Sequence, residues 1–586
     1  MSATSKRRGP GEVPPYLVPG FFGFLFLAVG ALWLAALVGA GRAGLPAPPA
    51  NPFSLPFLLI AGTYTWPGLW ANITLGLETA AVAAAAALVV RAVRKRRKGR
   101  LPIDAAARHM AKGRELEKIS GQGARATATR LGIPADRVPG VFLGNAVYGG
   151  TPLYGSVEDT HVHIWGPRTG KTTRLAVPPM LDHKAAPCLV TSNRRDIVDA
   201  TRLPRSQHGQ VWVFDLQGLI GEEPTWYYDP LSYVTDITRA TQLAAAFASN
   251  SRSAGARTDA YFEPAGQKLL ANLLLAAKLG DKPITTVYEW VSDSNEDEPE
   301  RILSGAGPQY RLAAKAVLSV LNLHEKQRGG IYGTAEQMAS CLQDPALAPW
   351  ITRGTGLDKR PAFDPAAFVR GTDTLYLISK DRQGSTGALI TALTLAVCEA
   401  AEEYASRSPR GRLPVPLLGV LDEAANVCRW EDLPSVYSHY GSRGINLMTI
   451  LQSWDQGVEA WGEHGMAKLW SSANVRTYGG GVSDDGLLSM LKKQIGSYER
   501  PAYSHSRQPG NGGGLFASNR SVSVSEREEA IVDYDDLAAM PQGRAVLLAS
   551  GTRPVLMQTV GWWEHPDAAL VNASLKRHDP GALSTS

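Results

Sequence analysis

Residues 161–173, HVHIWGPRTGKTT, combine residue types and a spacing that suit phosphate binding. Residues 161–165 alternate between polar and apolar as a short strand does, a Gly/Pro bend follows, and Gly170-Lys171-Thr172 opens a helical run. A strand, a tight loop and a helix N-terminus in this order direct backbone N–H groups and the positive end of the helix dipole at an anion. The segment therefore predicts a phosphate cradle, formed by Gly166, Pro167, Arg168, Thr169, Gly170, Lys171, Thr172 and Thr173.

Two side chains of this loop have defined roles in such a cradle. Lys171 would reach the β- and γ-phosphates of a nucleotide, and the Thr172 hydroxyl would hold Mg²⁺. The usual pattern also has a glycine five residues before Gly170, whereas this chain has Trp165 there and Gly166 one place later. An ordinary capped helix with an exposed lysine is the alternative, so the assignment depends on a second motif.

That second motif is PLLGVLDE, residues 416–423, an apolar strand that ends in two adjacent carboxylates. In a P-loop enzyme Asp422 orders the water shell of the Mg²⁺ ion, and Glu423 polarises the attacking water as general base. Alone, the Asp-Glu pair could merely begin a capped helix. Together with the GKT triplet upstream on the same predicted sheet, it predicts an ATPase that uses ATP and Mg²⁺.

Three further polar residues follow the carboxylates. Gln452 closes the next predicted strand, where an amide can contact the γ-phosphate or the lytic water, although a strand-end glutamine can also be purely structural. Arg443 precedes that strand and Arg476 lies on the following one. Either arginine could supply positive charge to the transferring phosphoryl group, and we favour Arg443 acting on a neighbouring subunit. A surface salt bridge is the commoner role of a lone arginine.

Short apolar strand candidates alternate with helical patterns through most of the chain. This order predicts a parallel, doubly wound α/β sheet with the ligand at the carboxyl ends of the strands. Residues 388–405 form one strong helical pattern. The strand candidates lie at residues 141–143, 147–148, 161–165, 188–190, 211–215, 375–378, 417–421, 447–451, 475–478, 545–549 and 554–560.

The predicted nucleotide-binding domain covers residues 101–254 and 351–575, and residues 255–350 interrupt it. This insert has helical patterns at 266–279, 310–323 and 334–342, with no strand between them. The third pattern opens with Thr334 and has Gln337 three residues later, the spacing of a capping box. Residues 504–528 are rich in Gly and Ser and are predicted to be a mobile loop, and residues 576–586 a disordered tail.

Two apolar segments near the N-terminus are long enough to cross a membrane. They lie at about residues 16–40 and 69–90, and a cluster of Lys and Arg ends the second at residue 100. The positive-inside rule places both chain ends in the cytoplasm. A cleavable signal peptide is the alternative for the first segment.

The four cysteines form no CxxC pair, which argues against zinc and disulfides.

The chain resembles the type IV coupling proteins of the TraG/TraD type, the membrane-anchored ATPases of conjugative DNA transfer. The resemblance is carried by the two spans, the WGPRTGKTT loop, residues 226–231 and 261–264, VLDEAANV, RGINLMTILQS and Asn474. It implies a RecA-like motor, usually a hexameric ring, in which the helical insert lies where the substrate enters. It also implies the roles assigned above to Lys171, Thr172, Asp422, Glu423, Gln452 and Arg443.

Two departures from the family pattern are Trp165, which is expected to weaken nucleotide affinity, and Ser192-Asn193-Arg194-Arg195-Asp196. Many relatives have an acidic DPKGE-like segment in place of residues 192–196. The basic residues of this chain would suit DNA phosphates.

The family resemblance predicts a cytoplasmic-membrane protein that moves DNA, with a bound relaxase, into a type IV secretion channel. An FtsK-like DNA translocase, a secretion ATPase that receives protein substrates, and a membrane adaptor that does not hydrolyse its nucleotide are the alternatives. The long insert and the lack of a terminal winged-helix module favour the coupling protein over the FtsK-like motor. Glu423 argues against the adaptor, which has no need of a placed base.

Overall fold

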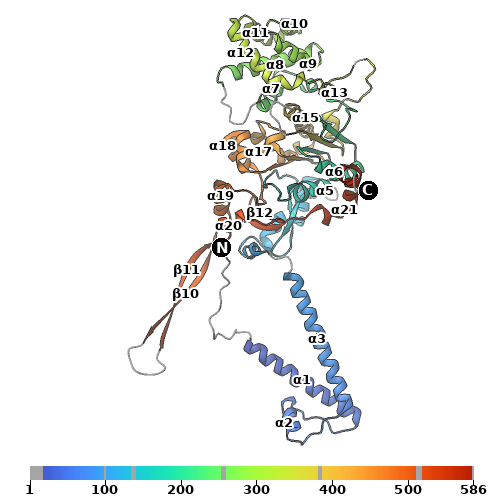
Figure 1. The fold of residues 1–586 in the computed structure, drawn as a ribbon, viewed down its shortest axis with the longest axis vertical. Coiled ribbons are helices and arrows are strands. Elements are labelled where there is room, and N and C mark those ends of the chain that lie inside the picture. Colours follow the sequence, from blue (N-terminus) through green and yellow to red (C-terminus); the bar gives the residue numbers. More distant parts are fainter. Residues whose placement is uncertain are drawn as a thin grey trace. The chain divides into compact units, whose positions relative to one another are not determined.

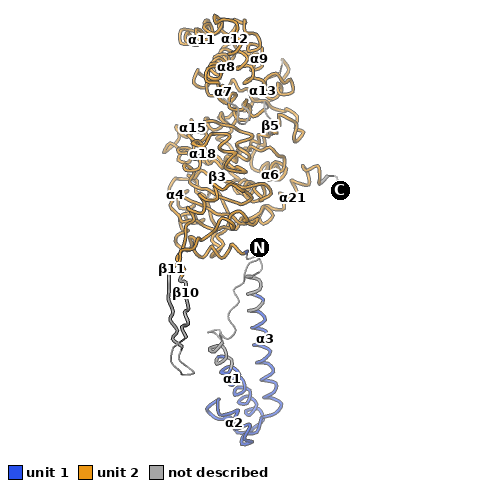
Figure 2. Tube along the Cα trace, turned by 60° about the vertical axis from the view of Figure 1, so that its left-hand side comes forward, with its two compact units in different colours: residues 1–101 blue, residues 102–586 orange. Residues whose placement is uncertain are grey.

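The computed structural model describes residues 17–97, 101–133, 140–251, 259–354, 356–380, 386–509 and 518–583. The chain forms two compact units, residues 1–101 and residues 102–586, which Figure 2 shows in different colours. All predicted site residues belong to the second unit.

An 11-stranded sheet forms the centre of the second unit, in the order β2-β1-β13-β12-β9-β3-β8-β7-β4-β6-β5 (Figure 1). From β9 to β5 every neighbouring pair is parallel, and from β9 to β2 every pair is antiparallel. The strands are β1 (Val141–Ala146), β2 (Pro152–Gly155), β3 (His161–Ile164), β4 (Cys188–Ser192), β5 (Val211–Asp215), β6 (Thr374–Ile378), β7 (Leu417–Asp422), β8 (Ile445–Leu451), β9 (Val475–Tyr478), β12 (Arg544–Ala549) and β13 (Val555–Gln558).

The predicted strands are confirmed with one exception, since residues 147 and 148 form a turn after β1. The parallel part of the sheet agrees with the prediction of a doubly wound fold. The antiparallel extension by β12, β13, β1 and β2 was not predicted. Alternating apolar patterns are the same for both directions of pairing, so the sequence alone did not separate them.

Helices cover both faces of the sheet, because strand residues that point either way are fully buried. One face packs on the helix after β3, on α6 (Asp196–Ser206) and on α21 (Ala568–His578), around a core that includes Trp165, Met180 and Val420. The helices α15 (Gly387–Ser406), α16 (Ala424–Val427), α17 (Leu433–Arg443) and α18 (Trp454–Ser472) contact β8. The predicted helix at residues 388–405 is α15.

The predicted insert is helical over its described residues 259–350, and the described residues between β5 and β6 contain no strand. Figure 1 shows these helices as a group at the end of the unit away from β12. They are α7 (Ile237–Ser251), α8 (Phe262–Leu279), α9 (Thr285–Ser292), α10 (Glu298–Gly305), α11 (Arg311–Leu321), α12 (Glu325–Ala339) and α13 (Ala348–Ile351). The boundaries 255 and 350 of the insert remain a prediction.

The predicted capping box at Thr334 is wrong. Thr334 lies inside α12, whose N-cap is His324, and its hydroxyl donates to the Gly330 carbonyl oxygen at 2.9 Å. A threonine side chain can cap a helix or, inside a helix, donate to a carbonyl oxygen of the preceding turn. The residue type alone therefore does not locate the start of the helix.

Residues 504–509 and 518–528 were predicted to be a mobile loop, and this is also wrong. They belong to a two-stranded hairpin of β10 (Ser497–Pro509) and β11 (Ser518–Ala530), paired without interruption from Ser497↔Ala530 to Pro509↔Ser518. Residues 510–517 of the predicted loop lie outside the described residues. Serine and glycine suggested a loop by composition, but the β-branched and aromatic residues between them also fit a strand.

The predicted disordered tail at 576–586 is helical up to residue 583, where α22 (Pro580–Leu583) ends. The Arg195 guanidinium donates to the His578 carbonyl oxygen at 2.7 Å and fixes the end of α21 on α6. Residues 584–586 lie outside the described residues. The remaining described α-helices of this unit are α4 (Gly121–Leu131), α5 (Val177–Asp182), α14 (Pro365–Phe368), α19 (Asp485–Ile495) and α20 (Tyr534–Ala538).

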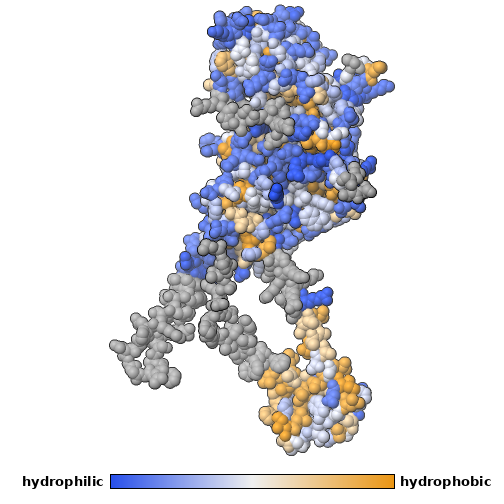
Figure 3. Space-filling view, viewed as in Figure 1, coloured by the Kyte–Doolittle hydropathy of each residue, from blue (hydrophilic) through white to orange (hydrophobic). Residues whose placement is uncertain are grey.

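The first unit consists of α1 (Leu17–Ala43), α2 (Leu55–Ile60) and α3 (Leu69–Arg97). The long helices α1 and α3 pack closely, since a Cβ on Gly39 would lie 2.6 Å from the Ala71 Cβ. Residues Leu25–Ala43 and Leu69–Leu88 are long and apolar enough to span a membrane. Figure 3 shows the apolar surface of this unit, to which Phe26 and Leu27 contribute.

Candidate nucleotide site

The loop after β3 has the backbone of an anion cradle. Gly170 has φ 90° and Arg168 has φ 61°, so the chain turns sharply before the helix begins. The Thr169 hydroxyl donates to the Gly166 carbonyl oxygen at 2.7 Å and closes the loop. The helix starts at Lys171 with a wide π-helical turn, η4 (Lys171–Ala176), and continues as α5 (Val177–Asp182).

The structure explains why tryptophan precedes glycine in this loop. Trp165 is completely buried, and its indole N–H donates to the Thr477 hydroxyl at 2.9 Å. The backbone at Gly481 passes directly over Gly166. A Cβ on residue 166 would lie 2.0 Å from the Gly481 carbonyl oxygen. Glycine is therefore needed at 166, and Trp165 is a core residue beneath the loop.

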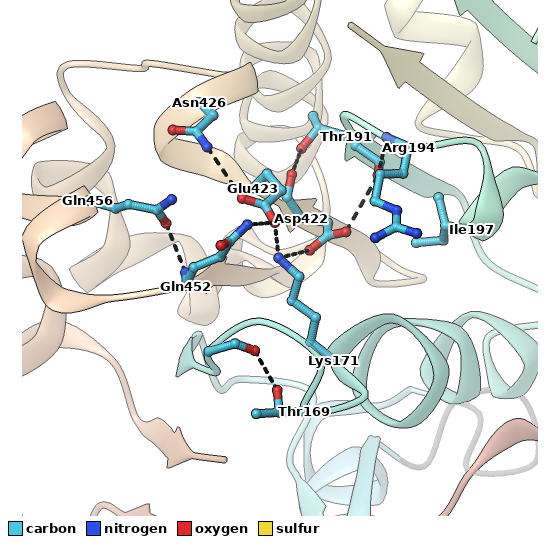
Figure 4. Close-up of polar contacts among 12 residues, drawn as sticks. Thr169, Lys171, Thr191, Arg194, Ile197, Asp422, Glu423, Asn426, Gln452 and Gln456 are labelled. Carbon is cyan, nitrogen blue, oxygen red and sulfur yellow. Dashed lines mark hydrogen bonds and ion pairs between the residues drawn. The ribbon is translucent and has the colours of Figure 1, made fainter. Parts of the chain in front are cut away.

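Lys171 extends from the loop to the carboxylates that end β7 (Figure 4). Its ammonium lies 3.9 Å from Asp422 Oδ1 and forms an ion pair with Glu423. Lys171 can reach these carboxylates because β3, β8 and β7 are adjacent parallel strands, whose carboxyl ends lie at one edge of the sheet. The structure thus brings together the lysine and both predicted carboxylates.

Gln452 completes this group from the end of β8. Its side-chain amide donates to Glu423 Oε1. Two residues that the sequence analysis missed support the pair: Asn426 donates to Glu423 Oε2 at 3.4 Å, and Gln456 accepts from the Gln452 backbone N–H at 2.9 Å. Asn426 follows Glu423 by three residues and Gln456 follows Gln452 by four. This helical spacing was the only feature of the sequence that could have predicted their contacts.

Glu423 has an unusual backbone for a residue with a side chain. Its φ is 56° and its ψ is 39°, in the left-handed region. Such a conformation costs of the order of 1–3 kcal/mol and is kept where surrounding contacts fix it. Its side chain is buried and held by Lys171 and Gln452, so the carboxylate occupies one defined place at the strand end.

Burial dominates the electrostatics of the site. It raises the pKa of Asp422 to about 6, although the Lys171 ammonium opposes this shift. It also lowers the pKa of Lys171, against the attraction of Asp422. Ser192 donates to Asp422 Oδ2 at 3.4 Å, whereas Oδ1 is buried and has no hydrogen-bond partner among the described residues. An unsatisfied buried carboxylate oxygen suits a hydrated Mg²⁺ ion.

The raised pKa gives a testable pH dependence. The folded chain binds the Asp422 proton more tightly than the unfolded chain does. The free energy of unfolding therefore decreases as the pH rises from the ordinary aspartate pKa of 3.8 to the raised pKa of about 6. Below about pH 6 the carboxyl would be protonated and would no longer bind Mg²⁺. We expect the increase in melting temperature that Mg²⁺ adds to nucleotide to be full at pH 7.5 and mostly lost at pH 5.5. Asp422→Asn should lack this Mg²⁺ effect at both pH values, and a wild-type effect that persists at pH 5.5 would contradict the assignment.

The predicted arginines lie away from this group. Arg443 ends α17, and its guanidinium contacts Glu402 at 3.1 Å. Gly444, directly after Arg443, has a left-handed backbone conformation and ends the helix. Arg443 precedes the amino end of β8, whereas the phosphate loop lies at the carboxyl ends, roughly 20 Å away at about 3.3 Å per residue. Arg476 is the second residue of β9, stacked on Trp470 at 5.8 Å.

The basic segment at residues 192–196 contributes one arginine near the site. Arg194 is 68 % exposed. Its positive charge adds to the lowering of the Lys171 pKa by burial and opposes the burial that raises the Asp422 pKa. Arg195 instead turns away and binds Asp199 at 2.7 Å. The predicted gain of positive charge at this strand end therefore comes from Arg194.

Residues 416–542, which include β7, β8 and β9, match the protein family described as the TraM recognition site of TraD and TraG. Comparison with curated proteins finds no significant match. In fold, the chain is similar to the bacterial conjugative coupling protein TrwBΔN70, with a TM-score of 0.53 and 14 % identity over 75 % of this chain and 91 % of that one. The family match thus covers one part of the α/β domain, and the structural match concerns the fold of that domain.

Two nucleotide complexes of the plasmid coupling protein TrwB are similar to the same part of the chain. The complex with the ATP analogue ADPNP gives a TM-score of 0.52, and the complex with ADP and Mg²⁺ gives 0.50. Each is 13 % identical and covers 75 % of this chain and 92 % of that one. At this identity the likeness establishes the fold, so the prediction of a RecA-like α/β domain is confirmed.

Proposed function

We propose that this chain is a membrane-anchored, ATP-driven coupling protein that recruits DNA, with a bound relaxase, and moves it into a conjugative type IV secretion apparatus. The observation that supports it most is the meeting of Lys171 with Asp422, Glu423 and Gln452 at the ends of β7 and β8. The family match over residues 416–542 adds a partner-recognition region on the same strands. The alternatives remain an FtsK-like translocase and a receptor for secreted proteins.

The residues present suit ATP and Mg²⁺. The backbone of residues 166–173 would hold the phosphates, Thr172 and Asp422 would hold Mg²⁺, and the bound ion would neutralise charge on the transferring phosphoryl group. Phosphate would attract Lys171 away from Glu423 and so free that carboxylate to accept a proton from water. Gln452, already bonded to Glu423, would orient the same water.

A single substitution tests the assignment of the loop. Lys171→Ala should reduce ATP binding below detection while the far-UV circular dichroism stays that of the native chain. Lys493→Ala, which removes an exposed lysine at the end of α19, is the matched control and should bind normally. Equal ATP affinity in both variants, measured by calorimetry, would contradict the proposed site.

The two apolar helices form the proposed anchor in the cytoplasmic membrane, with both chain ends in the cytoplasm. Since residues 102–586 form a compact unit that contains the whole site, we expect residues 101–586 alone to be soluble and to bind ATP. The same fragment should fail to support DNA transfer, because it is no longer concentrated at the channel. Wild-type transfer by the fragment in a mating assay would contradict the proposed role of the anchor.

A further inference from the structure

The chain after β13, residues 559–563, lies against the helix that follows the phosphate loop, and we refer to it as the C-terminal strap. Arg174, one turn beyond Gly170, donates from Nη1 to the Thr559 carbonyl oxygen at 3.0 Å. Its guanidinium lies 4.7 Å from the centre of the Trp563 ring. Trp563 is nevertheless 47 % exposed, so a large aromatic surface beside the loop remains accessible.

The strap lies on a defined side of the loop. The Lys171 ammonium points to β7, which marks the side where the terminal phosphate would lie. In the sheet, β8 and β7 lie on one side of β3, whereas β9, β12 and β13 lie on the other. The nucleoside end of a nucleotide must leave the loop away from its terminal phosphate, and therefore towards β9, β12 and β13.

Two side chains, Arg174 and Gln542, lie closest to Gly170 of the loop. A Cβ on Gly170 would lie 3.2 Å from Arg174 Cδ and 3.2 Å from Gln542 Nε2. Trp563 lies directly behind the Arg174 guanidinium. The Arg174 guanidinium therefore connects the anion cradle to this aromatic ring.

We propose that Trp563 is the surface on which the base of the bound nucleotide stacks, with Arg174 as the residue that positions the ring. The inference rests on the proposed function, because it requires a nucleotide in the phosphate loop. An indole ring offers a flat π-surface that accepts any nucleobase, and purines offer the larger area for stacking. The expected ligand is a purine nucleoside triphosphate, with little discrimination between adenine and guanine.

The arrangement of the strap supports a fixed ring. The Thr559 bond holds Arg174, and Arg174 holds one face of Trp563 by a cation–π contact. Trp562 meets Trp563 edge-on at 5.8 Å, and Gly561 allows close approach, since a Cβ there would lie 2.3 Å from the Trp563 ring. The ring is thus oriented before any ligand arrives, which limits the entropy lost when a base stacks on it.

The test uses the full-length chain in detergent and compares ATP with inorganic tripolyphosphate, which has the phosphates but no base. Trp563→Ala should weaken ATP binding by about tenfold to a hundredfold, the usual effect of losing a stacked base, and leave the affinity for tripolyphosphate unchanged. Trp563→Phe should restore most of the ATP affinity. Tyr148→Ala removes a ring of similar exposure, 51 %, at the turn after β1 and should change neither affinity.

Each other result has a definite meaning. Unchanged ATP affinity in Trp563→Ala would overturn the inference, and so would an equal loss for ATP and tripolyphosphate, because the strap would then only shape the loop. Equal affinities of the wild-type chain for ATP and for tripolyphosphate would overturn the inference as well. A wild-type chain that binds neither compound would instead contradict the proposed function itself.

Discussion

Replacing Glu423 by Gln is expected to abolish ATP turnover and to leave ATP bound. The carboxylate is buried, fixed in a left-handed backbone conformation and held by Lys171 and Gln452, so it is placed for one task. Glutamine keeps the size and the hydrogen bond to Gln452 but cannot accept a proton. The loss of a positioned general base lowers the rate by about 10²–10⁴-fold.

The measurement is steady-state ATP hydrolysis together with equilibrium ATP binding on the same preparation. Glu431→Gln makes the same chemical change at an exposed glutamate eight residues later and should keep the wild-type rate. A rate of Glu423→Gln within a few fold of wild type would exclude Glu423 as the base. A loss of ATP binding would show instead that its ion pair with Lys171 holds the loop together.

Arg443→Ala is expected to keep ATP affinity and to reduce turnover by about 10³–10⁵-fold, the contribution of an arginine finger in the best-studied nucleotide hydrolases. Arg443 lies near the amino end of β8 and cannot reach the phosphate loop of its own subunit. In a ring whose nucleotides lie between subunits, it would act on the neighbour. Its guanidinium is about one third exposed, so its ion pair with Glu402 is open to solvent and is expected to contribute little to stability.

Mixing experiments separate action between subunits from a structural role. Subunits with Arg443→Ala and subunits with Lys171→Ala, each inactive alone, should recover some turnover together, because some interfaces pair an intact loop with an intact arginine. Glu402→Gln removes the ion pair but keeps Arg443 and should remain active. Mixed rings that assemble without recovering activity would contradict action between subunits. Full activity of Arg443→Ala alone would transfer the role to Arg476.

The sequence predicted the site well where residues share a strand end. Lys171, Asp422, Glu423 and Gln452 follow short apolar strands, and parallel strands bring their carboxyl ends to one edge whatever lies between them. The sequence distance of about 250 residues from Lys171 to Asp422 was therefore no obstacle. Trp165 was interpreted as a defect of the loop, because its burial under Gly479–Gly481 depends on a strand that is more than 300 residues away.

Other features depend on tertiary contacts that no local pattern encodes. The direction of pairing at β12 and β13 follows from the way the chain returns to the sheet, and the left-handed backbone of Glu423 follows from its two partners. Trp563 carried no signal, since an aromatic pair after a strand is commonly core. Thr334 and the Ser-rich hairpin arms were misinterpreted because each residue type suits two environments.

ATP hydrolysis by this chain is expected to be coupled to DNA. The most direct test is the ATPase rate of residues 101–586, with and without single- or double-stranded DNA, at a salt concentration low enough for phosphate contacts. We expect a rate that rises severalfold with DNA and is absent from Glu423→Gln under both conditions. A DNA-independent rate that a secreted protein substrate stimulates, or no hydrolysis in any condition, would contradict it.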